Sequence, residues 1–254
     1  MIKEKTKKIH IAKVSKIEAV CEKNYYIEFE TKSVIESKPG QYVSILCGGL
    51  TLRRPFSIAF HQGKTIGVIF KEKGEGTAYI KSLKIGDSID FIGPLGNGFD
   101  IKKEKSLLIG AGIGVAPIFY LKTRLDSLDI ESCFMGGFLN NGQIPTSIKC
   151  DKIITNDGSF GEKGSVLDHV ENAIEEVKPS IIYACGPRVV LQKVCDLASK
   201  HSIPVQIAME KEMACGIGVC RGCVIKIKKD GIVQNATVCK DGPVFEGKDV
   251  IWTE

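Results

Sequence analysis

Residues 1 to about 101 show the alternation of apolar and polar positions that is typical of β-strands. Short runs of this kind occur at residues 9–14, 26–30 and 42–46. Turn signals such as Pro39-Gly40 and Gly86-Asp87 separate successive runs, and one short helix is expected at residues 76–83. The spacing of these strands and turns predicts a small β-barrel for the first segment.

From residue 102 to residue 209 the pattern changes to alternating strands and helices. Strands are predicted by short apolar runs at residues 106–109, 132–135, 152–155, 181–184 and 205–208. Helices are predicted between them at residues 116–128, 165–177 and 188–201. Such alternation indicates an α/β domain with a parallel sheet and helices on both of its faces.

Residues 210–254 form a third, shorter segment that is rich in glycine and cysteine. Two strands, at residues 224–228 and 232–238, are predicted around an Asp230-Gly231 turn, and this hairpin brings Cys239 back towards the cysteines that precede it. The expected fold class is therefore multi-domain β and α/β. A β-barrel, an α/β nucleotide-binding domain and a small C-terminal domain follow one another, with boundaries at 101/102 and 209/210.

Composition narrows the class of protein without identifying it. A hydrophobic fraction of 43% and a charged fraction of 26% are those of a soluble globular protein. The formal net charge of +5 is mild, and the basic clusters lack interleaved aromatic residues, which argues against nucleic-acid binding. The most apolar uncharged stretch, residues 106–121, is shorter than the ~20 residues of a membrane-spanning helix and contains three glycines and a proline. We therefore expect no membrane association.

Cysteine usage and the N-terminal sequence bear on the compartment. The basic N-terminus is not followed by an apolar core of a signal peptide, because charges interrupt residues 9–20. The six cysteines outside the C-terminal run show no spacing of a disulfide framework. Together these features favour a reducing cytoplasm.

Three cysteines in the C-terminal segment, Cys215, Cys220 and Cys223, are followed by Cys239. The C-x4-C-x2-C…C spacing is that of a plant-type 2Fe–2S ligand set. Glycines between the cysteines allow the loop to wrap closely and to turn backbone N–H groups towards the sulfurs. Zinc sites favour paired C-x2-C knuckles, and only one such pair is present. The spacing thus predicts a 2Fe–2S cluster in preference to zinc or to ordinary buried thiols.

Two motifs in the β segment have the chemistry of phosphate binding. In Arg54-Pro55-Phe56-Ser57 the guanidinium can bind a phosphate while the serine hydroxyl lies at a ring edge. A glycine-rich turn then leads through Gly76-Thr77 into the short helix, whose first N–H groups are available to a diphosphate. Each motif alone also fits surface arginines on an edge strand or an ordinary helix cap. Together they favour a dinucleotide such as FAD.

In the second segment a predicted strand leads into a helix through the run Gly110-x-Gly112-x-Gly114-x-x-Pro117. The backbone can approach a pyrophosphate there, although Val115 stands where the Rossmann fingerprint has its third glycine. Cys185-Gly186-Pro187 also ends a strand and starts a helix at the same edge of the sheet. Cys185 either contacts a nicotinamide or is a small buried residue, and both interpretations stay open. No catalytic triad, paired carboxylates or histidine metal site can be assigned.

The order of these motifs resembles that of the ferredoxin–NADP reductase superfamily, in which a β-barrel holds FAD and an α/β domain holds the nicotinamide nucleotide. With the C-terminal run from Met213 to Cys223, essentially all 254 residues resemble the electron-transfer subunits of B-type dihydroorotate dehydrogenases. The cluster run is the most specific part of this resemblance.

The resemblance implies a role for each matching residue. It places Arg54 on the FAD diphosphate and Ser57 beside the flavin ring. Phe56 stands where the superfamily often has tyrosine, so a phenol hydrogen bond is lost and only packing remains. The remaining positions implied for FAD are Pro55, Ile69, Phe70, Lys71, Gly76 and Thr77. Those implied for NAD are Gly110, Gly112, Gly114, Cys185, Gly186 and Pro187.

The resemblance also implies a function and a partner. A catalytic subunit containing FMN would oxidise dihydroorotate in pyrimidine biosynthesis, and this chain would pass the electrons through a 2Fe–2S cluster and FAD to NAD. Two copies of each subunit would form a heterotetramer. The chemistry agrees, because NADH exchanges two electrons as a hydride, a 2Fe–2S cluster exchanges one, and a flavin can do both.

Two alternatives stay open. The flavin subunit of an NADH-dependent ferredoxin:NADP oxidoreductase has the same layout, but its first cluster ligand is typically aspartate, whereas this chain has Cys215. A ferredoxin-like carrier without enzymatic activity would need neither nucleotide motif. NAD is expected in preference to NADP, because residues 136–140 supply no arginine for a 2′-phosphate.

Overall fold

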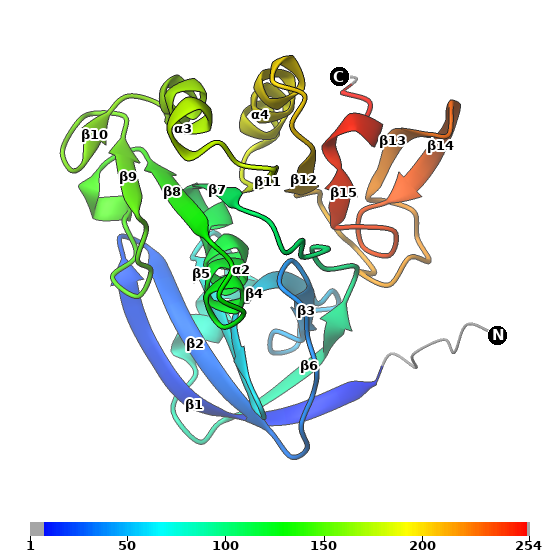
Figure 1. The fold of residues 1–254 in the computed structure, drawn as a ribbon. Helices are drawn as coiled ribbons and strands as arrows, with labels where there is room; N and C mark the ends of the chain where they lie inside the picture. Colours follow the sequence, from blue (N-terminus) through cyan, green and yellow to red (C-terminus); the bar gives the residue numbers. More distant parts are fainter. Residues whose placement is uncertain (1–7, 253–254) are drawn as a thin grey trace.

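The computed structural model describes residues 8–252, which form a closed β-barrel, an α/β layer and a small C-terminal lobe (Figure 1). This architecture confirms the predicted fold class. The barrel has the strand order β1-β2-β5-β4-β3-β6. Its strands are β1 (Ile9–Cys21), β2 (Asn24–Thr31), β3 (Tyr42–Ile45), β4 (Arg54–Gln62), β5 (Thr65–Lys71) and β6 (Ser88–Leu95), and the helix α1 (Glu75–Ser82) follows β5.

Apolar side chains that point inwards from the strands fill the barrel. On β2, Ile27 and Phe29 are fully buried, while Glu28 and Glu30 point outwards. The strand β1 continues to Cys21, well beyond the predicted residue 14. Its pairing with β2 shifts between Val14 and Lys16, and this irregularity breaks the period of two that a sequence pattern relies on.

The α/β layer is a seven-stranded sheet with the order β10-β9-β8-β7-β11-β12-β15. The first six strands in this order are parallel, and β15 is antiparallel to β12. The strands are β7 (Ser106–Ala111), β8 (Ser132–Phe138), β9 (Lys152–Thr155), β10 (Glu162–Lys163), β11 (Ile181–Cys185), β12 (Val205–Ala208) and β15 (Val244–Glu246). The parallel strands confirm the predicted α/β organisation.

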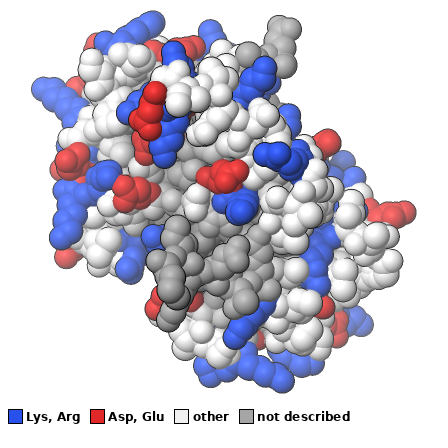
Figure 2. Space-filling model, turned by 90° about the vertical axis from the view of Figure 1, so that its right-hand side faces the viewer, with Lys and Arg blue, Asp and Glu red and all other residues white. Residues whose placement is uncertain are grey.

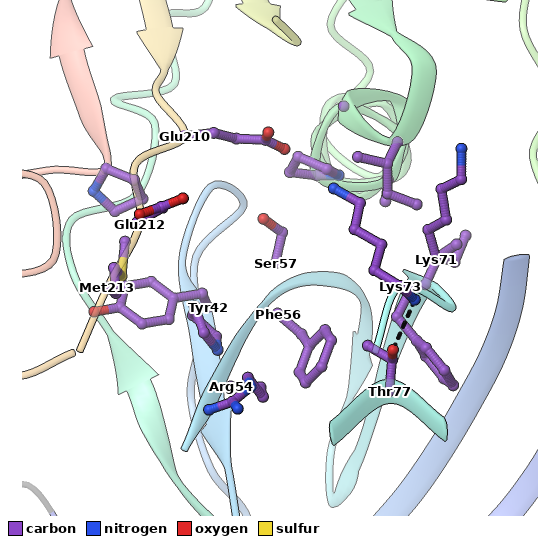
Figure 3. Close-up of a pocket in the computed structure, with 18 of the residues that line it drawn as sticks. Tyr42, Arg54, Phe56, Ser57, Lys71, Lys73, Thr77, Glu210, Glu212 and Met213 are labelled. Atoms are coloured by element: carbon purple, nitrogen blue, oxygen red, sulfur yellow. Dashed lines mark hydrogen bonds between the residues drawn. The ribbon is translucent and has the colours of Figure 1, made fainter. Parts of the chain in front are cut away.

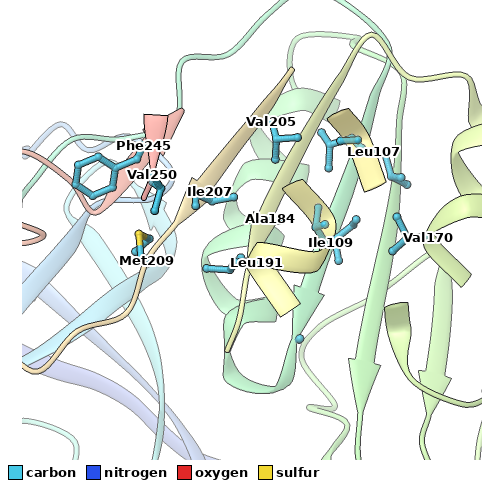
Figure 4. Close-up of a cluster of buried hydrophobic side chains, with 14 of the residues drawn as sticks. Leu107, Ile109, Val170, Ala184, Leu191, Val205, Ile207, Met209, Phe245 and Val250 are labelled. Carbon is cyan, nitrogen blue, oxygen red and sulfur yellow. The ribbon is translucent and has the colours of Figure 1, made fainter. Parts of the chain in front are cut away.

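Helices cover both faces of this sheet. They are α2 (Val115–Asp126), α3 (Val170–Val177) and α4 (Arg188–Lys200), with short 3-10 turns η1 (Gly112–Gly114), η2 (Asn141–Gln143), η3 (Val166–His169) and η4 (Gly247–Asp249). Leu108 packs with α2, on the face towards the barrel. Leu107 and Ile109 point the other way, into the cluster beneath α3 and α4 (Figure 4). Adjacent residues of one buried strand thus serve two cores.

The α-helix predicted at residues 165–177 begins later than expected, at Val170. The turn before it is the 3-10 turn η3. The hydroxyl of Ser165 accepts a hydrogen bond from the N–H of Leu167 at 3.3 Å, and the Asp168 carboxylate accepts one from the N–H of Ser165 at 2.7 Å. These local bonds hold the entry turn tighter than an α-helix.

The C-terminal lobe contains the hairpin of β13 (Val224–Lys229) and β14 (Ile232–Thr237), as predicted. The strand β15, which the sequence analysis assigned to a separate cluster domain, instead extends the α/β sheet, with Gln206 opposite Glu246. A three-residue strand offers too short a pattern to be recognised. The domain boundaries at 101/102 and 209/210 stay predictions.

The lobe is also tied to the barrel. The backbone N–H of Asn97 donates to the carbonyl of Gly242 at 2.6 Å, and the Asn97 side chain donates to the carbonyl of Asp241 at 2.7 Å. A Cβ on Gly96 would lie only 2.5 Å from the ring of Pro243, so the two backbones meet where no side chain fits. Barrel, sheet and lobe are therefore packed against one another.

Charged side chains are spread over the surface. On the face shown in Figure 2, acidic and basic residues are interspersed with uncharged areas. Among residues 8–252, no helix is both long enough and apolar enough to cross a membrane.

Leu107→Ala tests the core beneath α3 and α4. The side chain is fully buried, so its truncation should lower the free energy of unfolding by about 2–5 kcal/mol. Leu128→Ala is the matched control, because Leu128 is 46% exposed and its loss should change stability by less than about 0.5 kcal/mol. Urea denaturation followed by circular dichroism measures both, and equal effects would contradict this description of the core.

Candidate functional site

A cavity of about 670 Å³ lies where the barrel, the sheet and the C-terminal lobe meet. This volume is in the range of small-molecule and cofactor sites. All nine residues that the sequence analysis assigned to FAD line the cavity: Arg54, Pro55, Phe56, Ser57, Ile69, Phe70, Lys71, Gly76 and Thr77. They come from β4, β5 and the start of α1, so three consecutive elements of the barrel build one wall (Figure 3).

Arg54 and its neighbour Arg53 have different environments. The Arg53 guanidinium forms an ion pair with Asp90 on β6, with 2.7 Å between Nη1 and Oδ1. Arg54 lines the cavity, and its Nη1 donates to the carbonyl of Leu52 at 2.7 Å. Only one terminal nitrogen of Arg54 is engaged by this bond, and the guanidinium can offer further donors to an anion in the cavity.

The start of α1 lies directly beside Arg54. A Cβ on Gly76 would be 3.0 Å from Cγ and 3.1 Å from Nε of Arg54, so glycine permits the close approach of helix and guanidinium. The Thr77 hydroxyl accepts hydrogen bonds from the N–H groups of Lys73 and Gly74, at 2.9 and 3.1 Å, and donates to the Gly74 carbonyl at 2.9 Å. Thr77 thus shapes the turn, and any contact of its hydroxyl with a phosphate stays a prediction.

The aromatic residue of the first motif packs within the barrel. Phe56 meets Phe70 edge to face, with ring centroids 5.8 Å apart, and both rings line the cavity. Ser57 lies opposite Tyr42 in the pairing of β4 with β3. The wall therefore offers apolar surface for a flat ring, with the hydroxyl of Ser57 beside it.

The nucleotide motifs of the sheet divide into two groups. Gly114 and Cys185 line the cavity, whereas Gly110, Gly112, Gly186 and Pro187 do not. A Cβ on Gly114 would lie 2.4 Å from the carbonyl oxygen of Cys185, so this glycine permits contact between the turn η1 and the end of β11. Gly112 has a φ of +56°, and a Cβ placed on it would meet no atom within 4 Å. Of the three glycines in this turn, Gly112 is therefore the one whose backbone a ligand could approach.

Cys185 is a buried neutral thiol. Burial, and after it the negative charge of Glu210, raise the pKa of the Cys185 thiol well above its ordinary value. The thiol is 4% exposed and lines the cavity. It can therefore pack against a bound ring, and it has none of the thiolate character that a nucleophile needs.

The sequence analysis did not anticipate the third wall of the cavity, which is the segment from Met209 to Met213 after β12. Glu210 is exposed at the mouth of the cavity, and partial desolvation of its carboxyl there raises its pKa, while the charge of Lys73 opposes this shift. Figure 3 shows Lys73 extending across the cavity in the direction of Glu210. The alternating pattern did contain an indication of this wall. Segments that follow parallel strands lie at the same edge of a sheet, and the segment from Met209 to Met213 follows β12, the neighbour of β11.

The four predicted cluster ligands lie in the C-terminal lobe as two pairs. The N–H of Cys220 points at Sγ of Cys215 at 3.4 Å, and the N–H of Cys239 points at Sγ of Cys223, also at 3.4 Å. The N–H of Ile217 adds a 3.5 Å contact to the Cys215 sulfur. Cys223 and Cys239 are buried, whereas Cys220 is exposed.

Backbone N–H groups of this loop stabilise the thiolate form of Cys215. Burial opposes ionisation of Cys215, but the N–H groups of Cys220 and Ile217 outweigh it and lower the pKa of Cys215 to about 6. Burial and the neighbouring Cys223 thiol raise the pKa of Cys239 to about 12. Among residues 8–252, no three histidine, cysteine or acidic side chains converge on a single-ion position. The pairwise donor set fits two metal ions, as in a 2Fe–2S cluster.

Comparisons with known proteins agree with this geometry. A family model described as the iron-sulfur cluster binding domain of dihydroorotate dehydrogenase B matches residues 210–251. The dihydroorotate dehydrogenase B (NAD(+)) electron transfer subunit of Caldanaerobacter subterraneus subsp. tengcongensis is 37% identical over 238 residues, covering 90% of this chain and 92% of the relative. The subunit of the same name from Listeria innocua serovar 6a is 36% identical over 244 residues, covering 91% and 94%. The chain belongs to this family of electron transfer subunits.

A solved structure supports the fold of the family. A chain from the NADH-dependent reduced ferredoxin-NADP oxidoreductase, described in work on flavin-based electron bifurcation, superposes with a TM-score of 0.81 and 25% identity. The alignment covers 95% of this chain and 90% of the other. The resemblance stated from the motifs is thus confirmed, and the oxidoreductase alternative is not better supported than the family with 36–37% identity.

Arg54→Ala tests the assignment of the phosphate-binding arginine. The change removes a charge-assisted contact to a diphosphate, so FAD affinity should fall by roughly ten- to a hundredfold. Arg53→Ala is the matched control. The Arg53 guanidinium is already paired with Asp90, so its removal should lower FAD affinity much less. Titration of flavin into the flavin-free protein, followed by fluorescence quenching, gives both dissociation constants. Unchanged affinity in Arg54→Ala would mean that another group holds the phosphates.

Proposed function

We propose that this chain is the electron-transfer subunit of an NAD-linked dihydroorotate dehydrogenase complex in pyrimidine biosynthesis. A separate FMN-containing subunit oxidises dihydroorotate, and this chain passes the electrons through a 2Fe–2S cluster and FAD to NAD. Membership of the family supports this function, since the relatives carry this name. The observation that carries it is one cavity lined by the barrel motifs and by Gly114 and Cys185, whose wall residue Tyr42 is hydrogen-bonded to the cysteine loop.

The described residues have the chemistry needed to bind the three groups. Arg54 and the start of α1 would hold the FAD diphosphate, with Ser57 beside the flavin ring. The turn at Gly112, where a Cβ would meet no atom within 4 Å, would receive the pyrophosphate of NAD, and Cys185 on the cavity wall would pack against the nicotinamide. When bound, the flavin exchanges a hydride equivalent with the nicotinamide and single electrons with the cluster.

The cysteine loop is also the surface proposed to face the catalytic partner. Cys220 is exposed, Val219 is 75% exposed, and Arg221 lies next to them on the surface. Ile217 is partly buried beneath this tip. An exposed apolar side chain such as Val219 beside an arginine fits a protein interface, where apolar residues and arginine are both found. We propose that two copies of each subunit assemble through this surface into a heterotetramer.

NAD and the compartment are further parts of the proposal. The relatives are named for NAD(+), and residues 136–140, at the end of β8 and just after it, offer no arginine to a 2′-phosphate. Thiolate ligands are maintained in a reducing environment, which favours the cytoplasm.

Cys220→Ser tests the cluster. The purified parent protein should be reddish-brown, with two irons per chain, and the variant should lose most of this absorbance because one pair of ligands is broken. Cys133→Ser is the control, since Cys133 lies on β8 in the sheet and should leave the spectrum unchanged. Iron and zinc are counted by elemental analysis. Stoichiometric zinc in the parent, or an unaltered spectrum in Cys220→Ser, would contradict the assignment.

Cys223→Ser tests the direction of electron flow in the assembled complex. NAD-linked oxidation of dihydroorotate should be abolished, while reduction of the bound FAD by NADH should be largely retained, because the cavity is intact. The chain without its partner should reduce artificial acceptors with NADH and should not oxidise dihydroorotate. Coupling of dihydroorotate to NAD without a cluster would exclude the proposed route, and dihydroorotate turnover by this chain alone would refute the division of labour.

A further inference from the structure

Tyr42 is shared by the cavity and the cysteine loop. It lies on β3, is 3% exposed and forms part of the cavity wall. Its partner in the strand pairing is Ser57, which borders the same cavity. Figure 3 shows the Tyr42 side chain leading away from Ser57 towards Met213, where the chain enters the cysteine loop.

The Tyr42 hydroxyl ends between two carbonyl groups of that loop. It lies 2.8 Å from the carbonyl oxygen of Gly216 and 2.9 Å from that of Cys239. Both carbonyls can only accept, so the phenol is the donor and its proton is shared between them. Gly216 follows Cys215 in the chain, and the hydroxyl therefore holds the backbone next to one cysteine of each pair.

The strand β3 supports the loop at a second point. A Cβ on Gly216, which has a φ of +63°, would lie 3.5 Å from the Ser44 hydroxyl. Ser44 and Tyr42 are two residues apart and so lie on the same face of β3. The loop thus rests on the strand that borders the cavity, with the Tyr42 hydroxyl as its hydrogen-bond donor.

We propose that Tyr42 is a positioning residue for the one-electron transfer between the cluster and the flavin. Its ring lines the cavity proposed for the flavin, and its hydroxyl fixes the inner side of the cysteine loop and would favour the reduced form of the cluster. The inference rests on the proposed function and deepens it. In the transfer the cluster loses one electron and the flavin gains it, and Tyr42 is neither oxidised nor deprotonated.

The expected effect on the cluster follows from charge. Reduction adds a negative charge to a site that already carries four thiolates, so a donor dipole aimed at the loop stabilises the reduced form more than the oxidised form. Removing the hydroxyl removes this preference and leaves two buried carbonyls without their donor. The reduction potential of the cluster should therefore become more negative.

Tyr42→Phe in the full chain, loaded with FAD and the cluster, is the test. At the midpoint potential of the parent cluster, the ratio of reduced to oxidised cluster should fall by about two- to tenfold, the effect of one neutral hydrogen bond. Redox titration followed by electron paramagnetic resonance measures this ratio. Tyr183→Phe is the matched control, because the Tyr183 hydroxyl donates to the Asp100 carbonyl at 3.0 Å, away from the loop.

An unchanged potential in a Tyr42→Phe chain with full iron content would overturn the proposal. If that variant fails to hold the cluster, 3-fluorotyrosine at position 42 replaces it, because it keeps the hydroxyl and makes it a stronger donor. The potential should then shift in the opposite direction, and no shift would overturn the proposal. Failure of the proposed function is distinguishable, since the parent chain would then hold FAD and the cluster but would not support NAD-linked dihydroorotate oxidation with its partner subunit, and the effect of Tyr42→Phe on the cluster potential would still be measurable.

Discussion

The close approach of backbones around the central cavity is the constraint on which the site depends. Three units must meet there without side chains between them. Gly96 lets the barrel reach Pro243 of the C-terminal lobe, and within the α/β layer Gly114 lets the turn η1 reach the carbonyl of Cys185. A Cβ at either position would lie 2.5 Å or less from a neighbouring atom, so even alanine would push apart the two segments that meet there. These close contacts hold the segments around the cavity against one another.

Much of the fold could be predicted because its signals are local. The strand periodicity of the barrel and the succession of strands and helices after it are each built from short local patterns, and they led to the observed barrel and α/β layer. β15 was not predicted as part of the sheet, because three residues carry no period. The second half of β1 was missed because its register shifts beside Val14.

The site was predictable only where a short motif carried recognisable chemistry. Arg54 and Ser57 stood in one such motif, and both line the cavity. The choice of Arg54 over Arg53 came from the motif and the resemblance; its physical reason, an ion pair of Arg53 with Asp90, 37 positions away in the chain, is visible only in the structure. The sequence also could not reveal Tyr42, whose hydrogen bonds reach residues 174 and 197 positions further along. Contacts of that separation depend on the packed tertiary structure.

The cysteine loop has an inner and an outer side, which gives the site a polarity. Cys223 and Cys239 are buried, and the carbonyl of Cys239 accepts from Tyr42 on the cavity wall. Cys220 is exposed at the tip, beside Val219. The side held by hydrogen bonds thus faces the cavity, and the side open to solvent is available to another protein. The hydrogen bonds from Tyr42 hold the inner side whether or not the outer side contacts a partner. The loop can therefore keep its distance to the cavity when the complex forms.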